Sequence, residues 1–141
     1  MQSTLKEVRL VEKIIKNDVV KEKTIKNLYK HIFKSNGKKI RSKLNLIASS
    51  ANRKKKDRIK LAAIIELLHT ATLVHDDVVD DSSFRRGKES VNKLWSNAHG
   101  VLIGDYIYSK AFMYMVDIGN QEILSELSRA CLLYTSPSPR D

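Results

Sequence analysis

The chain has 141 residues, of which 26 are Lys or Arg and 16 are Asp or Glu, for a formal net charge of +10. Hydrophobic residues make up 42% and charged residues 30%, a balance typical of one soluble domain with a real core. The single cysteine, Cys131, excludes a disulfide framework, and residues 5–20 show no signal pattern, so a cytoplasmic protein is expected. The basic runs are not interleaved with aromatic residues and no nucleic-acid motif is found, which excludes nucleic acid as an expected partner.

Hydrophobic periodicity predicts an all-α fold, and two prolines near the C-terminus with only five glycines agree with it. Residues 4–33 are expected to form one or two amphipathic helices, followed by helices over 40–51, 59–79, 91–95, 98–116 and 118–130. Residues 82–90 are expected to form a loop. Gly104 is expected to permit close helix packing, with Asp105 able to cap, pair or approach a site. The core face of the 98–116 helix is predicted to be Val101, Leu102, Tyr106, Ile107, Phe112 and Met115.

Residues 131–141 change character, because Ser and Pro dominate and the helical periodicity stops. This segment resembles translated sequencing adapter. We therefore expect the domain to occupy residues 1–130 and residues 131–141 to be a non-native tail.

The strongest chemical signal is an acidic cluster at the end of the predicted 59–79 helix. Asp76, Asp77 and Asp80 share one face there, although carboxylates repel one another and the negative helix end repels them too. Oxygen-only ligands at this density favour a hard divalent cation, and Mg²⁺ fits better than Ca²⁺ because no EF-hand spacing is present. The alternative is a solvated acidic patch.

Basic residues flank this cluster on both sides. Lys38 and Arg41 lie in the first turn of a predicted helix, where they suit phosphate binding, or are simply a solvated pair. Arg85 and Arg86 follow the carboxylates and suit bidentate phosphate contacts, or else neutralise the acids as salt bridges. The position of His69 on the apolar 59–79 helix, taken alone, predicts a core histidine.

Four motifs in this order resemble the trans-polyprenyl diphosphate synthases, most closely the long-chain, octaprenyl-type enzymes. They begin with Gly37-Lys38-Lys39-Ile40-Arg41 and run from Leu68-His69-Thr70-Ala71-Thr72 through His75-Asp76-Asp77-Val78-Val79-Asp80. Arg85-Arg86-Gly87-Lys88 and Gly104-Asp105-Tyr106 complete the set. The resemblance implies an isoprenoid synthase-type bundle of antiparallel helices around a central cavity.

The resemblance also implies roles for residues of this chain. Asp76, Asp77 and Asp80 would be the first aspartate-rich motif and bind Mg²⁺ that bridges to an allylic diphosphate, which Arg85 would hold. Isopentenyl diphosphate would be bound by Lys38, Arg41, His69 and Arg86. In this family bulk just before the motif limits the product, so small Ala71 and Thr72 favour a long prenyl chain. The resemblance further suggests a homodimer, with peripheral membrane association for product release.

The chain departs from the family pattern at Asn36, where another glycine is usual, and at Ser42, where proline is usual. The family's second aspartate-rich motif lies beyond Ala130 and is absent. We therefore expect the 141-residue chain alone to be inactive and to expose apolar helix faces.

Other functions would need only part of this set of residues. A non-catalytic partner subunit would not need the carboxylates, and a terpene cyclase would not need Lys38, Arg41 and Arg86. A short-chain synthase making geranyl, farnesyl or geranylgeranyl diphosphate stays open.

Overall fold

The structure is a computed structural model that describes residues 2–17, 19–34 and 55–135. Its helices are α1 (Gln2–Lys16), α2 (Lys23–Phe33), α4 (Lys55–Val79), α5 (Val91–Leu94), α6 (Asn97–Ile118) and α7 (Gln121–Thr135). Between α4 and α5 lies a hairpin of β1 (Phe84–Arg85) and β2 (Lys88–Glu89). The predicted helix over 40–51 falls outside the described residues.

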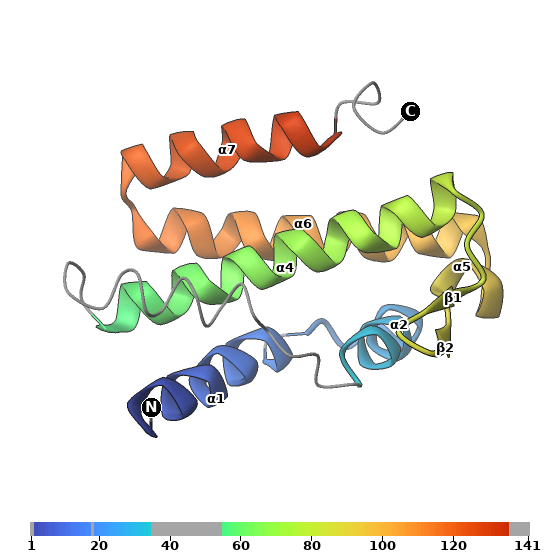
Figure 1. The fold of residues 1–141 in the computed structure, drawn as a ribbon, viewed down its shortest axis with the longest axis horizontal. Coiled ribbons are helices and arrows are strands. Elements are labelled where there is room, and N and C mark those ends of the chain that lie inside the picture. The colour runs from blue at the N-terminus through green and yellow to red at the C-terminus, as the bar shows by residue number, and fades with distance from the viewer. Residues whose placement is uncertain (1, 18, 35–54, 136–141) are drawn as a thin grey trace.

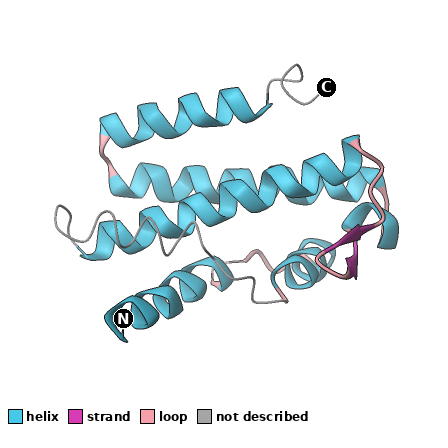
Figure 2. Cartoon of the chain, in the orientation of Figure 1, coloured by secondary structure: helices cyan, strands magenta, loops and turns pink. Residues whose placement is uncertain are grey.

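Helices α4 and α6 form the central pair and make the most extensive helix contact (Figure 1). α7 lies along one side of this pair, and α1 and α2 lie on the other. The hairpin and α5 sit beside the C-terminal end of α4, and Figure 2 shows that these two short strands are the only β structure in the described part of the chain. No described helix is long and apolar enough to cross a membrane.

The core forms where apolar faces of α1, α2, α4 and α6 meet. Its fully buried side chains include small residues on α4, which let the neighbouring helices approach. The largest fully buried side chains are Val11, Ile15, Leu28, Ile64, Leu67, Ile103, Ile107 and Met115.

Two glycines on α6 allow the close approach of α4. A Cβ on Gly104 would lie 2.2 Å from Nε2 of His75, and one on Gly100 would lie 2.5 Å from Cγ2 of Val78. The His75 ring therefore rests directly on the α6 backbone, which confirms the expected role of Gly104. Its Nε2 lies 3.3 Å from Oδ1 of Asp105, so Asp105 pairs with His75.

A buried lysine on α6 joins three helices, and nothing in the sequence pattern singled it out. Lys110 Nζ donates to the carbonyl of Ile15 at 2.7 Å, to the Tyr29 hydroxyl at 3.0 Å, and to the carbonyl of Asn17. The Tyr29 hydroxyl also donates to the Ile15 carbonyl, and burial raises the pKa of Tyr29. The ammonium thus caps the C-terminal carbonyls of α1, where the helix dipole favours a cation.

The predicted core face of α6 was partly wrong. Ile107 and Met115 are buried as expected, but Val101, Leu102 and Phe112 are 44%, 46% and 38% exposed. α6 is apolar on nearly every side, so the hydrophobic period could not indicate which of its faces is buried.

Two helix ends differ from the prediction. α4 begins four residues earlier than predicted, and α7 continues to Thr135, past the expected domain end at Ala130.

Candidate functional site

The acidic end of α4 closes in a Schellman motif. The amide of Asp81 donates to the carbonyl of Val78 at 3.3 Å, and that of Ser82 donates to the carbonyl of Asp77 at 2.9 Å. Asp81 has φ 53°, the left-handed conformation that glycine usually supplies at this position. The Asn92 side-chain amide also donates to the Asp77 carbonyl, at 3.2 Å. The helix end is therefore well capped despite its carboxylates.

The segment after α4 was expected to be a loop, and it contains a tight hairpin instead. Arg85 pairs with Lys88, and the two residues between them, Arg86 and Gly87, have φ 55° and 77°. Two successive left-handed residues are the signature of a type I′ turn, which matches the twist of a hairpin. The hairpin holds the two consecutive arginines in different settings, since Arg85 ends β1 and Arg86 is the first residue of the turn.

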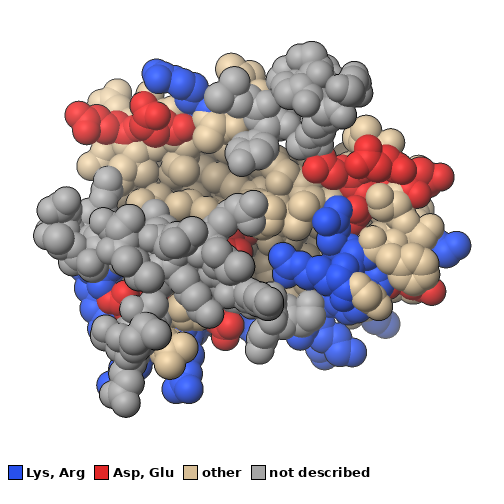
Figure 3. Space-filling model, viewed as in Figure 1, with Lys and Arg blue, Asp and Glu red and all other residues tan. Residues whose placement is uncertain are grey.

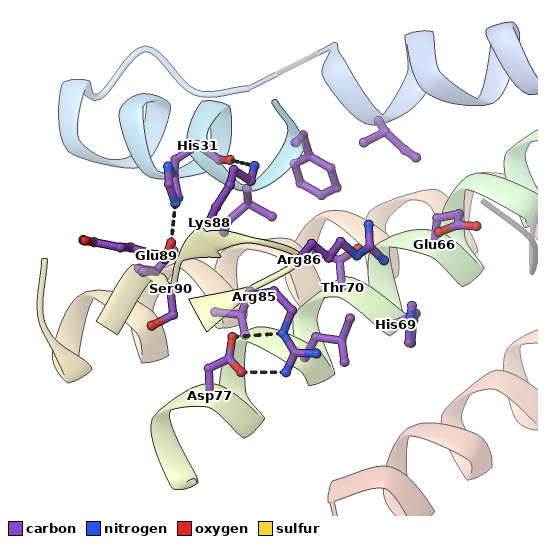
Figure 4. A pocket seen from close by; sticks show the side chains of 16 residues that line it. His31, Glu66, His69, Thr70, Asp77, Arg85, Arg86, Lys88, Glu89 and Ser90 are labelled. Atoms are coloured by element: carbon purple, nitrogen blue, oxygen red, sulfur yellow. Dashed lines mark hydrogen bonds and ion pairs between the residues drawn. The ribbon is translucent and has the colours of Figure 1, made fainter. Parts of the chain in front are cut away.

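Asp77 and Arg85 form a two-pronged ion pair. Arg85 Nη2 donates to Oδ1 at 2.6 Å and Nε donates to Oδ2 at 3.2 Å, while Asp77 is only 4% exposed (Figure 4). The hydrogen bonds from Arg85 to Asp77 raise the pKa of Arg85, and the charges of Asp77 and Asp80 add to the effect. For Arg85 the structure thus shows the salt-bridge alternative. Its predicted contact with a diphosphate stays a prediction.

A cavity of about 170 Å³ opens between α4, the end of α2 and the hairpin. In Figure 4 the Arg86 side chain runs along α4 above Thr70, toward the Glu66 end of this cavity, while Arg85 turns to Asp77. Figure 3 shows acidic side chains gathered over the C-terminal end of α4, next to basic side chains over the hairpin. The polar and charged lining residues are His31, Glu66, His69, Thr70, Asp77, Arg85, Arg86, Lys88, Glu89 and Ser90.

Four predicted site residues meet in this cavity: His69, Asp77, Arg85 and Arg86. Asp80 is exposed at the helix end and Asp76 is half-buried, and neither lines the cavity. Lys38 and Arg41 lie outside the described residues. The sequence reasoning missed His31 and Lys88, although Lys88 belongs to the Arg-Arg-Gly-Lys motif and was available as a signal.

The two residues predicted to set product length separate in the structure. Thr72 lines a second cavity of about 120 Å³ between α4, α6 and α7, together with His69 and Tyr108. Ala71 is fully buried in the helical core and lines neither of these two cavities. Burial raises the pKa of Tyr108 to about 12, and the nearby Cys131 and Asp105 contribute in the same direction.

The acidic end of α4 offers carboxylate oxygens to a metal ion but no closed set of ligands in the described residues. Among the described residues, no three His, Cys, Asp or Glu side chains converge closely enough to hold a metal, and Asp77 gives both of its oxygens to Arg85. The donor chemistry fits Mg²⁺, since Asp76, Asp77 and Asp80 offer only carboxylate oxygens from one helix turn. Such a set suits an ion that completes its shell with water or phosphate oxygens.

Known proteins share this helical arrangement. The polyprenyl synthetase family model matches residues 22–136. The all-trans-nonaprenyl-diphosphate synthase of Rhodobacter capsulatus is 44% identical over 106 residues, covering 74% of this chain and 33% of that protein. The octaprenyl diphosphate synthase of Escherichia coli is 42% identical over 107 residues, covering 75% of this chain and 33% of that protein.

The structural comparison agrees. A polyprenyl synthase from Caulobacter crescentus, solved in complex with calcium and isoprenyl diphosphate, superposes with a TM-score of 0.87 at 34% identity. The match covers 92% of this chain and 40% of that one. The fold is that of a mostly helical protein of the isoprenoid synthase type. The chain belongs to the polyprenyl synthetase family, and it spans about a third of the length of the curated relatives named above.

Proposed function

We propose that this chain is the N-terminal part of a Mg²⁺-dependent trans-polyprenyl diphosphate synthase. Such an enzyme condenses isopentenyl diphosphate with an allylic diphosphate into a long all-trans prenyl chain. The observation that carries the proposal is the cavity in which Arg85, Arg86 and Lys88 meet His69 and Asp77. Clustered cations beside a carboxylate suit a diphosphate accompanied by a divalent metal.

The residues of this chain would act mainly by electrostatics. Bound Mg²⁺, held by Asp76, Asp77 and Asp80, would supply Lewis-acid stabilisation of the departing diphosphate. Arg85 would hold the same diphosphate, and its fixed charge would stabilise the negative charge that develops as the carbon–oxygen bond breaks. Arg86 and His69, with Lys38 and Arg41, would orient isopentenyl diphosphate for attack on the allylic carbon.

The second cavity is the expected direction of chain growth. Ile65, Leu68 and Leu127 line it beside Thr72, so its wall is largely apolar and would exclude water from the reactive allylic cation. Thr72 is therefore the better candidate for setting product length. A larger residue at Ala71 would overpack the core before it reached this cavity.

The assembled enzyme is proposed to be a cytoplasmic homodimer that contacts the membrane when it releases its long apolar product. The relatives at 44% and 42% identity carry names of long-chain synthases, which favours this product class over the short-chain alternative. Because those relatives are about three times as long as the matched segment, we expect the 141-residue chain alone to be catalytically inactive.

A chimera tests this function. The matching residues of this chain replace the corresponding segment of the E. coli octaprenyl enzyme, and incorporation of labelled isopentenyl diphosphate into extractable product is measured. Asp77→Asn should lower the rate by about a hundredfold or more, since it removes a carboxylate that would hold the Mg²⁺ that stabilises the leaving diphosphate. The exposed Asp117→Asn on α6 is the matched control and should change the rate less than twofold.

Two results would count against the proposal. One is a chimera that is folded, by circular dichroism and cooperative thermal unfolding, yet makes no prenyl product. The other is equal activity of the Asp77 and Asp117 variants.

A further inference from the structure

The hairpin that carries the two arginines is too small to hold itself in place. Each strand has two residues, and an isolated two-stranded hairpin is at best marginally stable in water. Its turn also places Arg86, a residue with a side chain, in the left-handed region, which costs about 1 kcal/mol or more. Contacts outside the hairpin must therefore fix its orientation.

One set of outside contacts comes from the last turn of α4 and from Ser82 and Ser83, which connect α4 to β1. Arg85 makes its bidentate ion pair with Asp77. The Ser90 hydroxyl donates to the Ser82 carbonyl at 2.7 Å, and the Ser90 amide donates to the Ser83 carbonyl at 2.9 Å. These bonds fix the base of the hairpin. The ion pair with Asp77 also fixes the Arg85 side chain independently of the rest of the hairpin.

A second set joins the hairpin to α2, and two of its bonds are reciprocal. His31 Nε2 donates to the carbonyl of Glu89 at 2.9 Å, and Lys88 Nζ donates to the carbonyl of His31 at 3.0 Å (Figure 4). Because a carbonyl can only accept, His31 must carry its hydrogen on Nε2. The ring of His31 also packs edge-on against Trp95, with centroids 5.3 Å apart. We call His31, Lys88 and the Glu89 carbonyl the α2–hairpin contact.

The position of Lys88 is unusual for a lysine in a short strand. Partial burial lowers the pKa of Lys88, and the charges of Lys34 and Arg86 lower it further. An ammonium with only a solubilising role would extend into water, away from those cations. Lys88 instead binds a carbonyl in the last turn of α2, where the helix dipole favours a positive charge.

We infer that His31 and Lys88 are positioning residues, which orient the hairpin so that Arg86 points along α4 into the cavity. The inference rests on the proposed function, since it concerns the arginines assigned to the diphosphates. Arg85 is held by Asp77 whatever the α2–hairpin contact does. Arg86 sits in the turn itself, so the direction of its side chain follows the orientation of the hairpin.

Hydrogen exchange tests the structural part without any ligand. In the 141-residue chain, His31→Ala and Lys88→Met should each speed exchange of the Ser90 amide about tenfold and leave the Leu67 amide in the α4 core unchanged. Lys88→Arg keeps a donor for the His31 carbonyl and should restore protection. Lys30→Met removes the same charge from an exposed position on α2 and is the matched control. Unchanged Ser90 exchange, or equal acceleration of both amides, would overturn the inference.

Binding of inorganic pyrophosphate with Mg²⁺, followed by calorimetry on the same chain, tests the functional part. His31→Ala should weaken binding about fivefold to tenfold although every Lys and Arg remains, and Lys88→Arg should bind like the wild type. Wild-type affinity in the His31→Ala variant would refute the positioning role. If the wild-type chain binds no pyrophosphate, the proposed function loses its support in this chain, and the exchange data alone decide whether His31 and Lys88 orient the hairpin.

Discussion

The carboxylate of Asp77 is buried and gives both of its oxygens to Arg85, so a metal ion must compete with a guanidinium for it. The same arginine is proposed to hold the diphosphate. Arg85→Gln should therefore have opposite effects on Mg²⁺ affinity in two conditions. Without pyrophosphate the affinity should rise about tenfold, because the carboxylate is released, and with pyrophosphate it should fall, because a diphosphate ligand is lost.

Metal titration of the 141-residue chain by calorimetry, with and without pyrophosphate, measures both effects. Arg86→Gln removes the same charge one residue away and is the matched control, expected to weaken only the titration that contains pyrophosphate. A fall in Mg²⁺ affinity of the Arg85 variant in both conditions would contradict the competition.

At single residues, the sequence indicated which side chains have the chemistry of a binding site. It did not indicate which groups these side chains contact in the folded structure. The spacing of Asp77 and Arg85 identified both as charged site residues, and no spacing rule says whether an arginine eight positions on binds a carboxylate or a ligand. His31 gave no signal, because its role depends on the hairpin that packs against α2, 57 and 58 residues away in sequence. Such contacts between distant segments are set by the tertiary fold.

Between elements, the packing of α4 on α6 depends on glycines rather than on large apolar side chains. Gly104→Ala would force the His75 ring away from the α6 backbone and from Tyr108, whose ring centroid lies 5.6 Å from that of His75. Overpacking costs about 1–3 kcal/mol, and the better helix propensity of Ala returns about 1 kcal/mol. We expect a net loss of up to about 2 kcal/mol in the free energy of unfolding, measured by urea denaturation.

A double-mutant cycle isolates this contact. With His75→Ala the space opposite Gly104 is open, so Gly104→Ala should then be neutral or stabilising. An equal loss from Gly104→Ala in both backgrounds would show that the His75 ring is not the obstacle.

Helix positions could be read from the sequence because α1 and α2 have regular apolar periods and α4 contains a long, almost wholly apolar run. The hairpin could not, because its strands have two residues each and its turn begins with arginine instead of the usual Asn or Asp. The buried face of α6 could not be predicted for a different reason. Apolar residues surround this helix, and the buried face is the one on which Gly100 and Gly104 let α4 approach.

For the molecule as a whole, the exposed face of α6 is largely apolar, although the exposed Asp105 and Ser109 interrupt it. Met113 and Val116 are 66% and 69% exposed, and Val101, Leu102 and Phe112 extend the same surface. Apolar surface of this kind favours association. Met113→Lys with Val116→Glu should shift the 141-residue chain toward monomer in sedimentation velocity at micromolar concentration, with little change in stability. Leu5→Glu, at an apolar position on α1 that is 56% exposed, is the control, and an equal shift in that variant would contradict a specific role for the α6 face.

The fold class and the family followed from the sequence, because four motifs keep their order along one chain. The cavity did not, since its walls come from α2, α4 and the hairpin, and only the tertiary structure brings them together.

The turn of the hairpin affects how the protein resists proteolysis. Arg86 and Gly87 are both exposed, and the bond between them follows an arginine, which is the preferred cleavage site of trypsin-like proteases. A protease needs its substrate extended, however, and both turn residues are left-handed, so cleavage must wait until the hairpin opens. A cut there would leave Arg85 and Arg86 on one fragment and Lys88, with its hold on α2, on the other. The turn that aims the arginines is therefore also the point at which proteolysis would disconnect them.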